Sequence, residues 1–395
     1  MNVATRLLGR KPNSCSCWLK CSYSFQSITN GLTKDSNQAI NKAVYDAEKI
    51  VGFPTSFLSL RALLSNELSA VALHLRKLVR TNHPLIKTAR GMLFDSKHNV
   101  QVRGLVVLLL SKAIADKDGG IEASEIYSRH RSLAELTELI HTAFLIHRGL
   151  VDVETLLKVD SKNSRGELEL GNKMAVLSGD FLLANACVAL SELKNSKVVD
   201  LMSSSISDMS HGFFVLPESG EFSHITSLED LPMSLTQWRD IMYLAHGSLL
   251  SNACRASVQL AGKSVEYGNT ASEFGKHLIL AQLANFDLQR VNNGNGNNGQ
   301  NHNFLSEICM LPVVLAAEQN NGQKWMEQFL ENEGNEYKLC KDKLLTSVKQ
   351  NTKAMEDADQ TRKCHRNLAL QSLSELPLCE ERTSLELLTN AFAGS

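Results

Sequence analysis

The spacing of apolar residues is the feature that most constrains the fold of this chain. After about residue 40 these residues recur at steps of three and four, which places them along one face of an α-helix. Strand-like alternation is scarce, and the whole chain contains only 7 prolines. We therefore predict an all-α helical bundle. The apolar stripes are formed by Phe57, Leu60, Leu64, Leu68, Val71, Leu75 and Leu78, by Leu133, Leu136, Ile140, Ala143 and Phe144, and less regularly by Leu278, Ala281 and Leu288.

Two segments interrupt the helical pattern. Ala115–Gly120 contains a turn-forming Asp-Lys-Asp-Gly-Gly cluster. Residues 292–303 read NNGNGNNGQNHN and contain almost nothing that a core could bury, so we predict a flexible loop there. The loop is expected to join helices within one domain that spans residues 40–395.

The composition excludes several classes of protein. The net charge is −1, from 41 basic and 42 acidic residues, so nothing favours a nucleic-acid partner. The 9 cysteines are odd in number and irregularly spaced, which predicts free thiols in a reducing compartment. No uninterrupted apolar run reaches the roughly 20 residues that a membrane-spanning helix needs, so we expect no transmembrane segment.

The first residues differ in composition from the rest. Met1–Lys34 contains no Asp or Glu, but it contains five Arg or Lys residues and several serines. Its apolar stretches are too short for a secretory signal. This composition predicts a disordered mitochondrial transit peptide over residues 1–36, and hence a protein of the mitochondrion, in the matrix. An ordinary disordered tail is the alternative.

Three segments resemble the trans-polyprenyl diphosphate synthase family. Residues 138–152 read ELIHTAFLIHRGLVD, similar to the family's ELIHTASLIHDDVVD. Residues 171–186 read GNKMAVLSGDFLLANA, similar to GNKxAVLxGDFLLAxA, and residues 310–315, MLPVVL, resemble TLPVI. The resemblance runs from about residue 50 to the C-terminus. Within the family, Glu48–Leu68 looks most like the non-catalytic second subunits of decaprenyl and solanesyl diphosphate synthases.

The resemblance implies an isoprenoid-synthase-like helical bundle and a reaction that depends on magnesium. In this reaction an allylic diphosphate loses pyrophosphate, and isopentenyl diphosphate attacks the resulting carbocation. Magnesium ions neutralise the leaving group and require carboxylate ligands. The family supplies these ligands from two D-D-x-x-D motifs, in which the first and last Asp share one face of a helix.

Both motifs are degenerate here. The carboxylate positions of the first motif hold Arg148, Gly149 and Asp152, and those of the second hold Phe286, Asp287 and Arg290. An arginine repels magnesium, and neither motif keeps a pair of carboxylates. We therefore expect no intact catalytic residues, no metal site and no bound cofactor in this chain, with Mg²⁺ bound by a catalytic partner.

Other parts of the family's site are also changed. The stretch that binds isopentenyl diphosphate aligns with residues 98–104, where Val100 replaces its lysine and Arg103 keeps one arginine. The family's Lys-Thr pair falls near Ala245–Gly247, which contains no lysine. His141 is retained, so Arg103 and His141 are weak candidates for binding a diphosphate. The alternative for both residues is that they were retained by descent and bind no ligand.

Several polar residues of these segments also have structural interpretations. His141 and His147 are six residues apart and so face different sides of a helix, which argues against a zinc site. Asp180 is expected to make a local hydrogen bond, and Arg148 to be a solvated cation or part of a surface ion pair. Glu135 and Glu138 share a helix face that we interpret as solvated.

These observations predict the non-catalytic subunit of a heteromeric trans-polyprenyl diphosphate synthase that makes the ubiquinone side chain. The partner would be a catalytic polyprenyl diphosphate synthase subunit, and the complex would bind the allylic diphosphate and isopentenyl diphosphate. The faces Phe57–Leu78 and Leu133–Phe144 are predicted to pack against that partner, through Leu64 or Leu139. The alternatives are a free-standing prenyltransferase with an atypical metal site, for which the Glu135–Glu138 pair is the candidate, and a scaffold or binding protein that kept the bundle.

Overall fold

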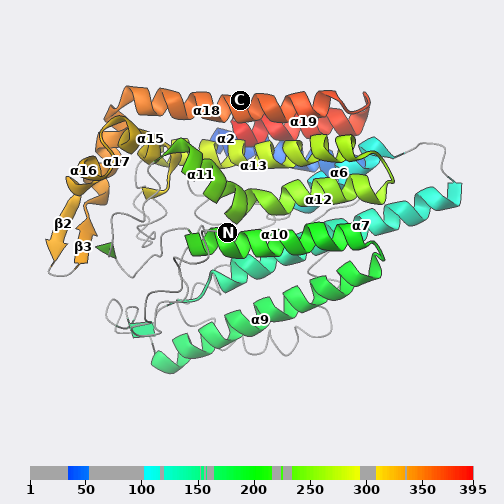
Figure 1. The fold of residues 1–395 in the computed structure, drawn as a ribbon, viewed down its shortest axis with the longest axis horizontal. Helices are drawn as coiled ribbons and strands as arrows, with labels where there is room; N and C mark the ends of the chain where they lie inside the picture. The colour runs from blue at the N-terminus through cyan, green and yellow to red at the C-terminus, as the bar shows by residue number, and fades with distance from the viewer. Residues whose placement is uncertain are drawn as a thin grey trace, which may run out of the picture.

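The computed structural model describes residues 34–52, 102–115, 120–151, 153–154, 157, 164–215, 224–225, 234–293, 308–333 and 336–394. These residues form a helical bundle with a small sheet at one end (Figure 1). The elements are α2 (Lys34–Val51), α6 (Val102–Ile114), α7 (Gly120–His147), α9 (Arg165–Glu192), α10 (Ser196–Val215), β1 (His224–Ile225), α11 (Leu235–Met242), the π-helix η3 (Tyr243–Gly247), α12 (Ser248–Leu260), α13 (Val265–Asn293), α15 (Leu311–Gln319), α16 (Gln323–Glu327), β2 (Leu330–Glu333), β3 (Glu336–Leu339), α17 (Lys341–Gln350), α18 (Thr352–Ser374) and α19 (Glu380–Ala393).

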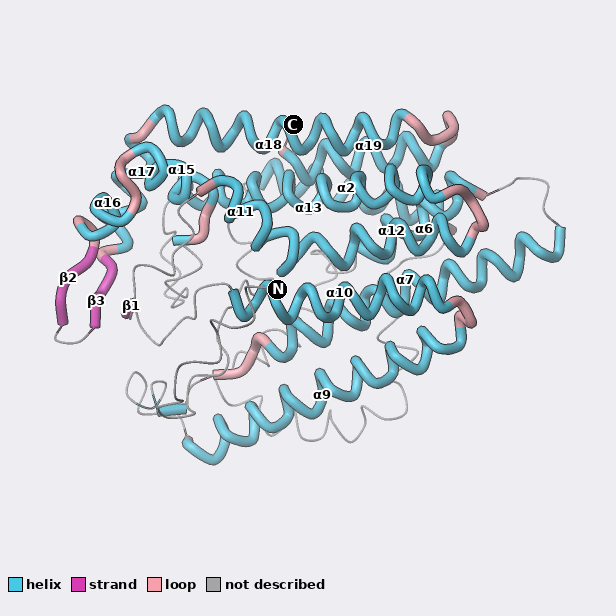
Figure 2. Tube along the Cα trace, in the orientation of Figure 1, coloured by secondary structure: helices cyan, strands magenta, loops and turns pink. Residues whose placement is uncertain are grey.

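The long helices lie side by side in layers. In Figures 1 and 2, α18 and α19 form one outer layer, and α9 lies at the opposite edge. Between them α13 packs against both α12 and α18, while α12 also packs against α10, and α7 lies against α9. This arrangement confirms the predicted all-α bundle.

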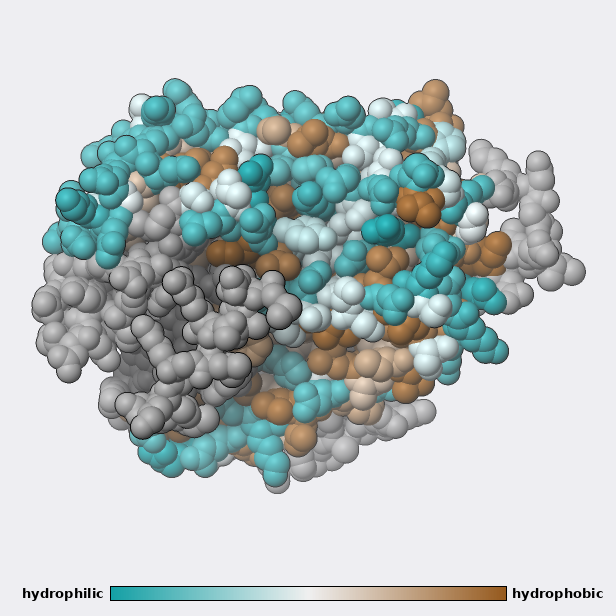
Figure 3. Space-filling model, viewed as in Figure 1, coloured by the Kyte–Doolittle hydropathy of each residue, from teal (hydrophilic) through white to brown (hydrophobic). Residues whose placement is uncertain are grey.

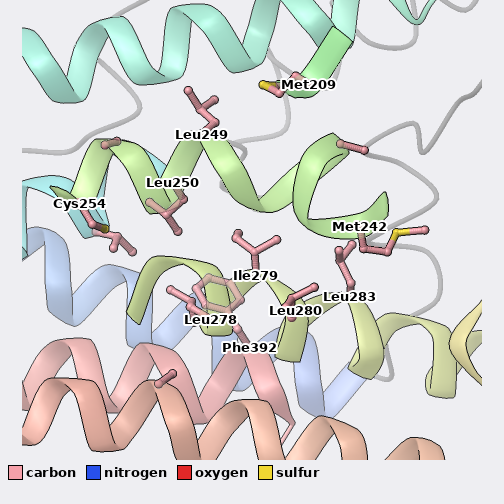
Figure 4. Close-up of a cluster of buried hydrophobic side chains, with 14 of the residues drawn as sticks. Met209, Met242, Leu249, Leu250, Cys254, Leu278, Ile279, Leu280, Leu283 and Phe392 are labelled. Atoms are coloured by element: carbon pink, nitrogen blue, oxygen red, sulfur yellow. The ribbon is translucent and has the colours of Figure 1, made fainter. Parts of the chain in front are cut away.

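One central part of the core lies between α12 and α13, which pack against each other. Leu250 and Cys254 of α12 face Leu278 and Ile279 of α13, and Phe392 of α19 closes the cluster from below (Figure 4). The two helices approach closely because Gly275 has no side chain: a Cβ there would lie 2.9 Å from the carbonyl oxygen of Leu250.

Two of the predicted apolar stripes are buried in this core. Leu133, Leu136, Ile140 and Ala143 have no exposed surface, and Leu278, Ala281 and Leu288 are also buried. The prediction that Leu133–Phe144 packs against a partner is therefore wrong, because this stripe packs against the chain's own helices. Leu139, proposed to face the partner, is likewise buried, whereas Phe57–Leu78, Leu64 included, lies outside the described residues.

A three-stranded antiparallel sheet extends one end of the bundle. β2 and β3 form a hairpin in which Leu330 pairs with Leu339, and β1 adds to the other edge of β3, where His224 pairs with Lys338. The strand order is β1-β3-β2. The sheet is an addition to the all-α bundle that the apolar periodicity did not indicate.

Helix α9 is apolar on both faces. Its inner face buries residues such as Leu182 and Leu190 against the bundle, whereas Leu177, Phe181 and Val188 are exposed on its outer face. Figure 3 shows hydrophobic residues gathered on the surface over α9 and α10. By length and composition α9 is the one helix in the described part of the chain that could cross a membrane, a property that helices of a bundle core share.

Candidate functional site

The first motif forms a turn immediately after α7. The helix ends at His147, and Arg148 and Gly149 close the turn with amide hydrogen bonds to Phe144 and Ile146. Arg148 is not the fully solvated cation that was one of our two expectations. It is half-buried, and its guanidinium carbon lies 4.5 Å from the centroid of the Phe213 ring on α10. The last motif residue, Asp152, lies outside the described residues.

Arg103 and His141 are brought together by the packing of α6 against α7. Nη1 of Arg103 lies 2.9 Å from Nε2 of His141. Because the guanidinium is the donor, Nε2 of His141 accepts this hydrogen bond and carries no proton. Burial, with the nearby positive charges, holds the pKa of His141 well below its ordinary value, so the imidazole is neutral.

Glu138 is a residue of α7 whose side chain contacts the start of α6, beside the Arg103–His141 pair. Its carboxylate accepts a hydrogen bond of 2.6 Å from the backbone N–H of Gly104, where an anion is also favoured by the helix dipole. Burial raises the pKa of Glu138 to about 7, although the Gly104 hydrogen bond and the Arg103 charge oppose this shift. The interpretation of Glu138 as part of a solvated face is therefore wrong. Glu135 is the partly exposed member, and it accepts from Arg131 at 3.0 Å.

His246 completes the cluster from the π-helix η3. Its ring lies edge-on to Phe213, with 5.7 Å between ring centroids, so Phe213 contacts both His246 and Arg148. This contact depends on Gly212, because a Cβ there would lie 2.4 Å from the backbone nitrogen of Ala245. Burial, followed by the charges of Arg148 and Arg103, holds the pKa of His246 well below its ordinary value.

The second motif is part of the core. On α13, Phe286 is buried and Arg290 is half-buried. Asp287 is almost fully buried, and its Oδ2 accepts a 2.9 Å hydrogen bond from the first backbone N–H of α15, that of Leu311. Burial raises the pKa of Asp287 to about 7, against the opposing effects of this hydrogen bond and of Arg290. Asp287 thus stabilises the start of α15.

The predicted separation of the two α7 histidines is confirmed. His141 faces Arg103 on α6, whereas Nε2 of His147 lies 3.2 Å from the carbonyl oxygen of Val176 and 3.2 Å from Oδ1 of Asp180, both on α9. Asp180 therefore makes a contact between helices and not the purely local bond that we expected.

Magnesium ions do not fit these residues. At the first motif a guanidinium stacks on an aromatic ring, and at the second the one carboxylate is already bound to a backbone N–H. Magnesium requires several oxygen ligands in an octahedral arrangement. Across the residues that the structure describes, no group of three or more His, Cys, Asp or Glu side chains is placed to hold a metal ion.

The fold and the motif positions define a class of protein. Residues 93–346 match the polyprenyl synthetase family, and the chain belongs to this family. It is 41% identical over 352 residues to the mouse (Mus musculus) protein All trans-polyprenyl-diphosphate synthase PDSS2, a match that covers 88% of this chain and 85% of the mouse protein.

Two further proteins extend the comparison. The probable mitochondrial hexaprenyl pyrophosphate synthase of Neurospora crassa is 31% identical over 290 residues, which cover 62% of this chain and 61% of that protein. The apo form of an Arabidopsis medium/long-chain length prenyl pyrophosphate synthase has a TM-score of 0.55 at 25% identity, covering 84% of this chain and 98% of that structure.

Sequence reasoning missed two members of the cluster, Phe213 and His246. His246 falls where the family has its Lys-Thr pair. The absence of the lysine does not by itself indicate that the imidazole of His246 contacts Phe213. Phe213 lies in a segment for which we identified no family motif. Their proximity to Arg148 depends on how α10 packs against η3, which no local pattern reveals.

Proposed function

We propose that this chain is the non-catalytic subunit of a heteromeric trans-polyprenyl diphosphate synthase. The complex would elongate an allylic diphosphate with isopentenyl diphosphate to make the ubiquinone side chain. The observation that carries the proposal is the state of the two motifs: Arg148 stacks on Phe213, and Asp287 is committed to the start of α15. The similarity to the mouse PDSS2 protein supports it.

The test is a prenyl-transfer assay on three samples. These are this chain alone, an Asp-rich homologue alone, and the two co-expressed, each with Mg²⁺, an allylic diphosphate and labelled isopentenyl diphosphate. We expect extended product only from the mixture. Turnover by this chain alone would instead establish a free-standing prenyltransferase. Full activity of the homologue without this chain, with no co-elution of the two, would leave the scaffold alternative.

The outer face of α9 is the surface that we assign to the catalytic partner. A helix that is apolar all round is normally buried, yet the outer face of α9 exposes Leu177, Phe181 and Val188. Asp180 is next to Phe181 in the chain. Its carboxylate contacts His147 of α7, but its side chain is 62% exposed, and an exposed carboxylate disfavours insertion into lipid. A homologous helical subunit can cover such a face with an apolar interface of the obligate kind.

A matched pair of substitutions tests this assignment. Leu177 on α9 and Leu387 on α19 are both helical and are 53% and 54% exposed. We expect Leu177→Glu to abolish co-elution with the catalytic homologue and prenyl transfer by the mixture, while Leu387→Glu leaves both unchanged. Equal behaviour of the two variants would refute the α9 interface. Loss of co-elution only with a second copy of this chain would assign the face to a homodimer.

We further propose that the protein works in the mitochondrial matrix and that residues 1–36 are removed on import. The acid-free, basic composition of Met1–Lys34 supports this, as does the mitochondrial name of the Neurospora crassa relative. N-terminal sequencing of the protein from purified mitochondria provides the test. An intact Met1 on a cytosolic protein would contradict the proposal.

A further inference from the structure

Two histidines face each other where α13 packs against α18, outside both motif regions. Nδ1 of His277 on α13 lies 2.9 Å from Nδ1 of His365 on α18, and the two rings are stacked with 5.0 Å between their centroids. His365 is buried, and only 12% of the His277 side chain is exposed. The two helices are therefore joined inside the bundle by a pair of titratable groups.

The short contact between the two imidazoles limits how many protons they can hold. A ring nitrogen donates a hydrogen bond when it carries a proton and accepts one when it does not. The 2.9 Å contact is thus a hydrogen bond only when one of the two Nδ1 atoms, and not both, carries a proton. If both imidazoles were charged, two N–H groups would point at each other and the hydrogen bond between the helices would be lost.

Glu273 sets the direction of this hydrogen bond. Its Oε2 lies 3.2 Å from Nε2 of His277, one turn further along α13. A carboxylate only accepts, so Nε2 of His277 carries a proton, and in the neutral ring Nδ1 is then the acceptor. His365 therefore donates from Nδ1 to His277, which in turn donates to Glu273.

The surroundings of the pair oppose further positive charge. The other charged groups that act on the pair are Glu273 and Lys276 of α13 and Arg239 of α11. Burial has the largest effect and lowers the pKa of His277; Lys276 and Arg239 lower it further, whereas Glu273 raises it. Burial, followed by the charges of His277, Arg239 and Lys276, lowers the pKa of His365 to about 3.

We propose that the His277–His365 pair is an acid-sensitive contact, which holds α18 against α13 while one proton lies between the imidazoles and opens when both are charged. Opening the contact exposes both rings to water, where each binds a proton without the penalty of burial. Acid therefore favours the open form, and at neutral pH the contact is closed.

The direction and size of the effect on stability follow from His365. Its native pKa lies below the ordinary value of 6.5, so its contribution to stability is fully present above pH 6.5 and is lost as the pH falls to about 3. At pH 5 this loss is about thirtyfold in the equilibrium constant for folding, relative to pH 8.

Urea denaturation of the full-length chain at pH 5 and at pH 8 tests the proposal. His365→Asn places an amide nitrogen near the position of Nδ1, so it keeps a donor for His277 but removes the titrating ring. We expect the folding constant of this variant to fall about thirtyfold less between pH 8 and pH 5 than that of the wild type. His211→Asn is the matched control, because His211 is an exposed histidine on α10, and its pH dependence should equal that of the wild type.

A second measurement uses the unmodified chain and so does not depend on a variant that folds. Nitrogen NMR of the chain labelled at its histidines reports which ring nitrogen carries the proton. At neutral pH we expect a proton on Nδ1 of His365 and on Nε2 of His277, the two being identified by the contacts between their stacked rings.

Either of two results would overturn the proposal. One is a proton on Nε2 alone in both histidines, which leaves no proton between them. The other is a pH dependence of His365→Asn equal to that of the wild type. No partner, ligand or product enters these measurements, so their outcome is independent of the proposed function.

Discussion

The two motif regions differ in what occupies their carboxylate positions. At the end of α7, Arg148 stands where a carboxylate is expected, and its guanidinium lies over the ring of Phe213, whose ring also contacts His246. On α13 the corresponding positions belong to the core, with Phe286 buried and Asp287 bonded to α15. The first region therefore carries a half-buried cation, whereas the second carries a buried carboxyl group that holds the start of a helix.

The comparison shows what each region can change without loss of the fold. A cation at the C-terminal end of α7 is favoured by the helix dipole and stacks on an aromatic ring, so the first motif tolerates a reversal of charge. A carboxylate buried in the bundle needs a hydrogen-bond donor, and the first backbone N–H of α15 donates to Asp287. Four predictions test this contrast, in order of decreasing effect.

Gly212→Ala should have the largest effect on stability, and this effect should be confined to the first region. The new Cβ would lie 2.4 Å from the backbone nitrogen of Ala245, and only backbone movement could relieve the clash. We expect a loss of about 3 kcal/mol in the free energy of unfolding, measured by urea denaturation.

The control for this variant is Gly166→Ala on α9, where no atom lies within 4 Å of the added Cβ. This substitution should be neutral or stabilise the helix by up to about 1 kcal/mol. Equal stability of the two variants would show that the contact between α10 and η3 does not hold the cluster together.

The pH dependence of stability should be shared by both regions. The pKa of Glu138 rises from 4.5 to about 7, and that of Asp287 from 3.8 to about 7, on burial. Between the unfolded-state and native-state pKa of each group, the native state binds more protons than the unfolded state. The stability that each protonated carboxyl group contributes is therefore fully present below its unfolded-state pKa and is lost as the pH rises to about 7. Each contribution is on the order of 1–3 kcal/mol.

Urea denaturation of the wild type, Glu138→Gln and Asp287→Asn between pH 4 and pH 8 measures these contributions. Each amide variant should lose less stability than the wild type as pH rises through its window. If the unfolding free energies of the wild type and of Glu138→Gln changed in parallel with pH, Glu138 would not be buried in its protonated form.

Asp287→Ala should have a moderate effect confined to the second region. It leaves the Leu311 N–H buried without its acceptor, which costs about 1–2 kcal/mol of unfolding free energy. Asp287→Asn retains an oxygen acceptor and should cost less. Equal stability of Asp287→Ala and Asp287→Asn would show that this hydrogen bond does not hold the start of α15.

Restoring two carboxylates to the first region should have the smallest effect. The double substitution R148D and G149D is expected to produce no magnesium-dependent prenyl transfer by this chain alone. The second region would still offer only Asp287, whose Oδ2 is already used, and groups that act as a unit are not rescued singly. The assay with labelled isopentenyl diphosphate decides this, and any extended product would contradict our account of the second region.

Much of the fold could be predicted from the chain itself. Apolar residues at steps of three and four along residues 133–144 and 278–288 require helices with a buried face, and both segments are buried helices. The family follows from long matching segments around His141 and Gly171, and in that alignment each motif lacks two of its three carboxylates. These features are local, so the sequence alone determined them.

The tertiary structure decided which buried face belongs to the chain's own core and which remains for a partner. A helical pattern alone does not distinguish Leu139, which is buried, from Leu177, which is exposed, and only packing shows the difference. It also decided the fate of the polar residues. Glu138 looks solvated by its spacing, yet it is bonded to Gly104, and His246 meets Arg148 through Phe213. Such contacts join residues far apart in the chain, and their energies depend on burial and charge that no short segment carries.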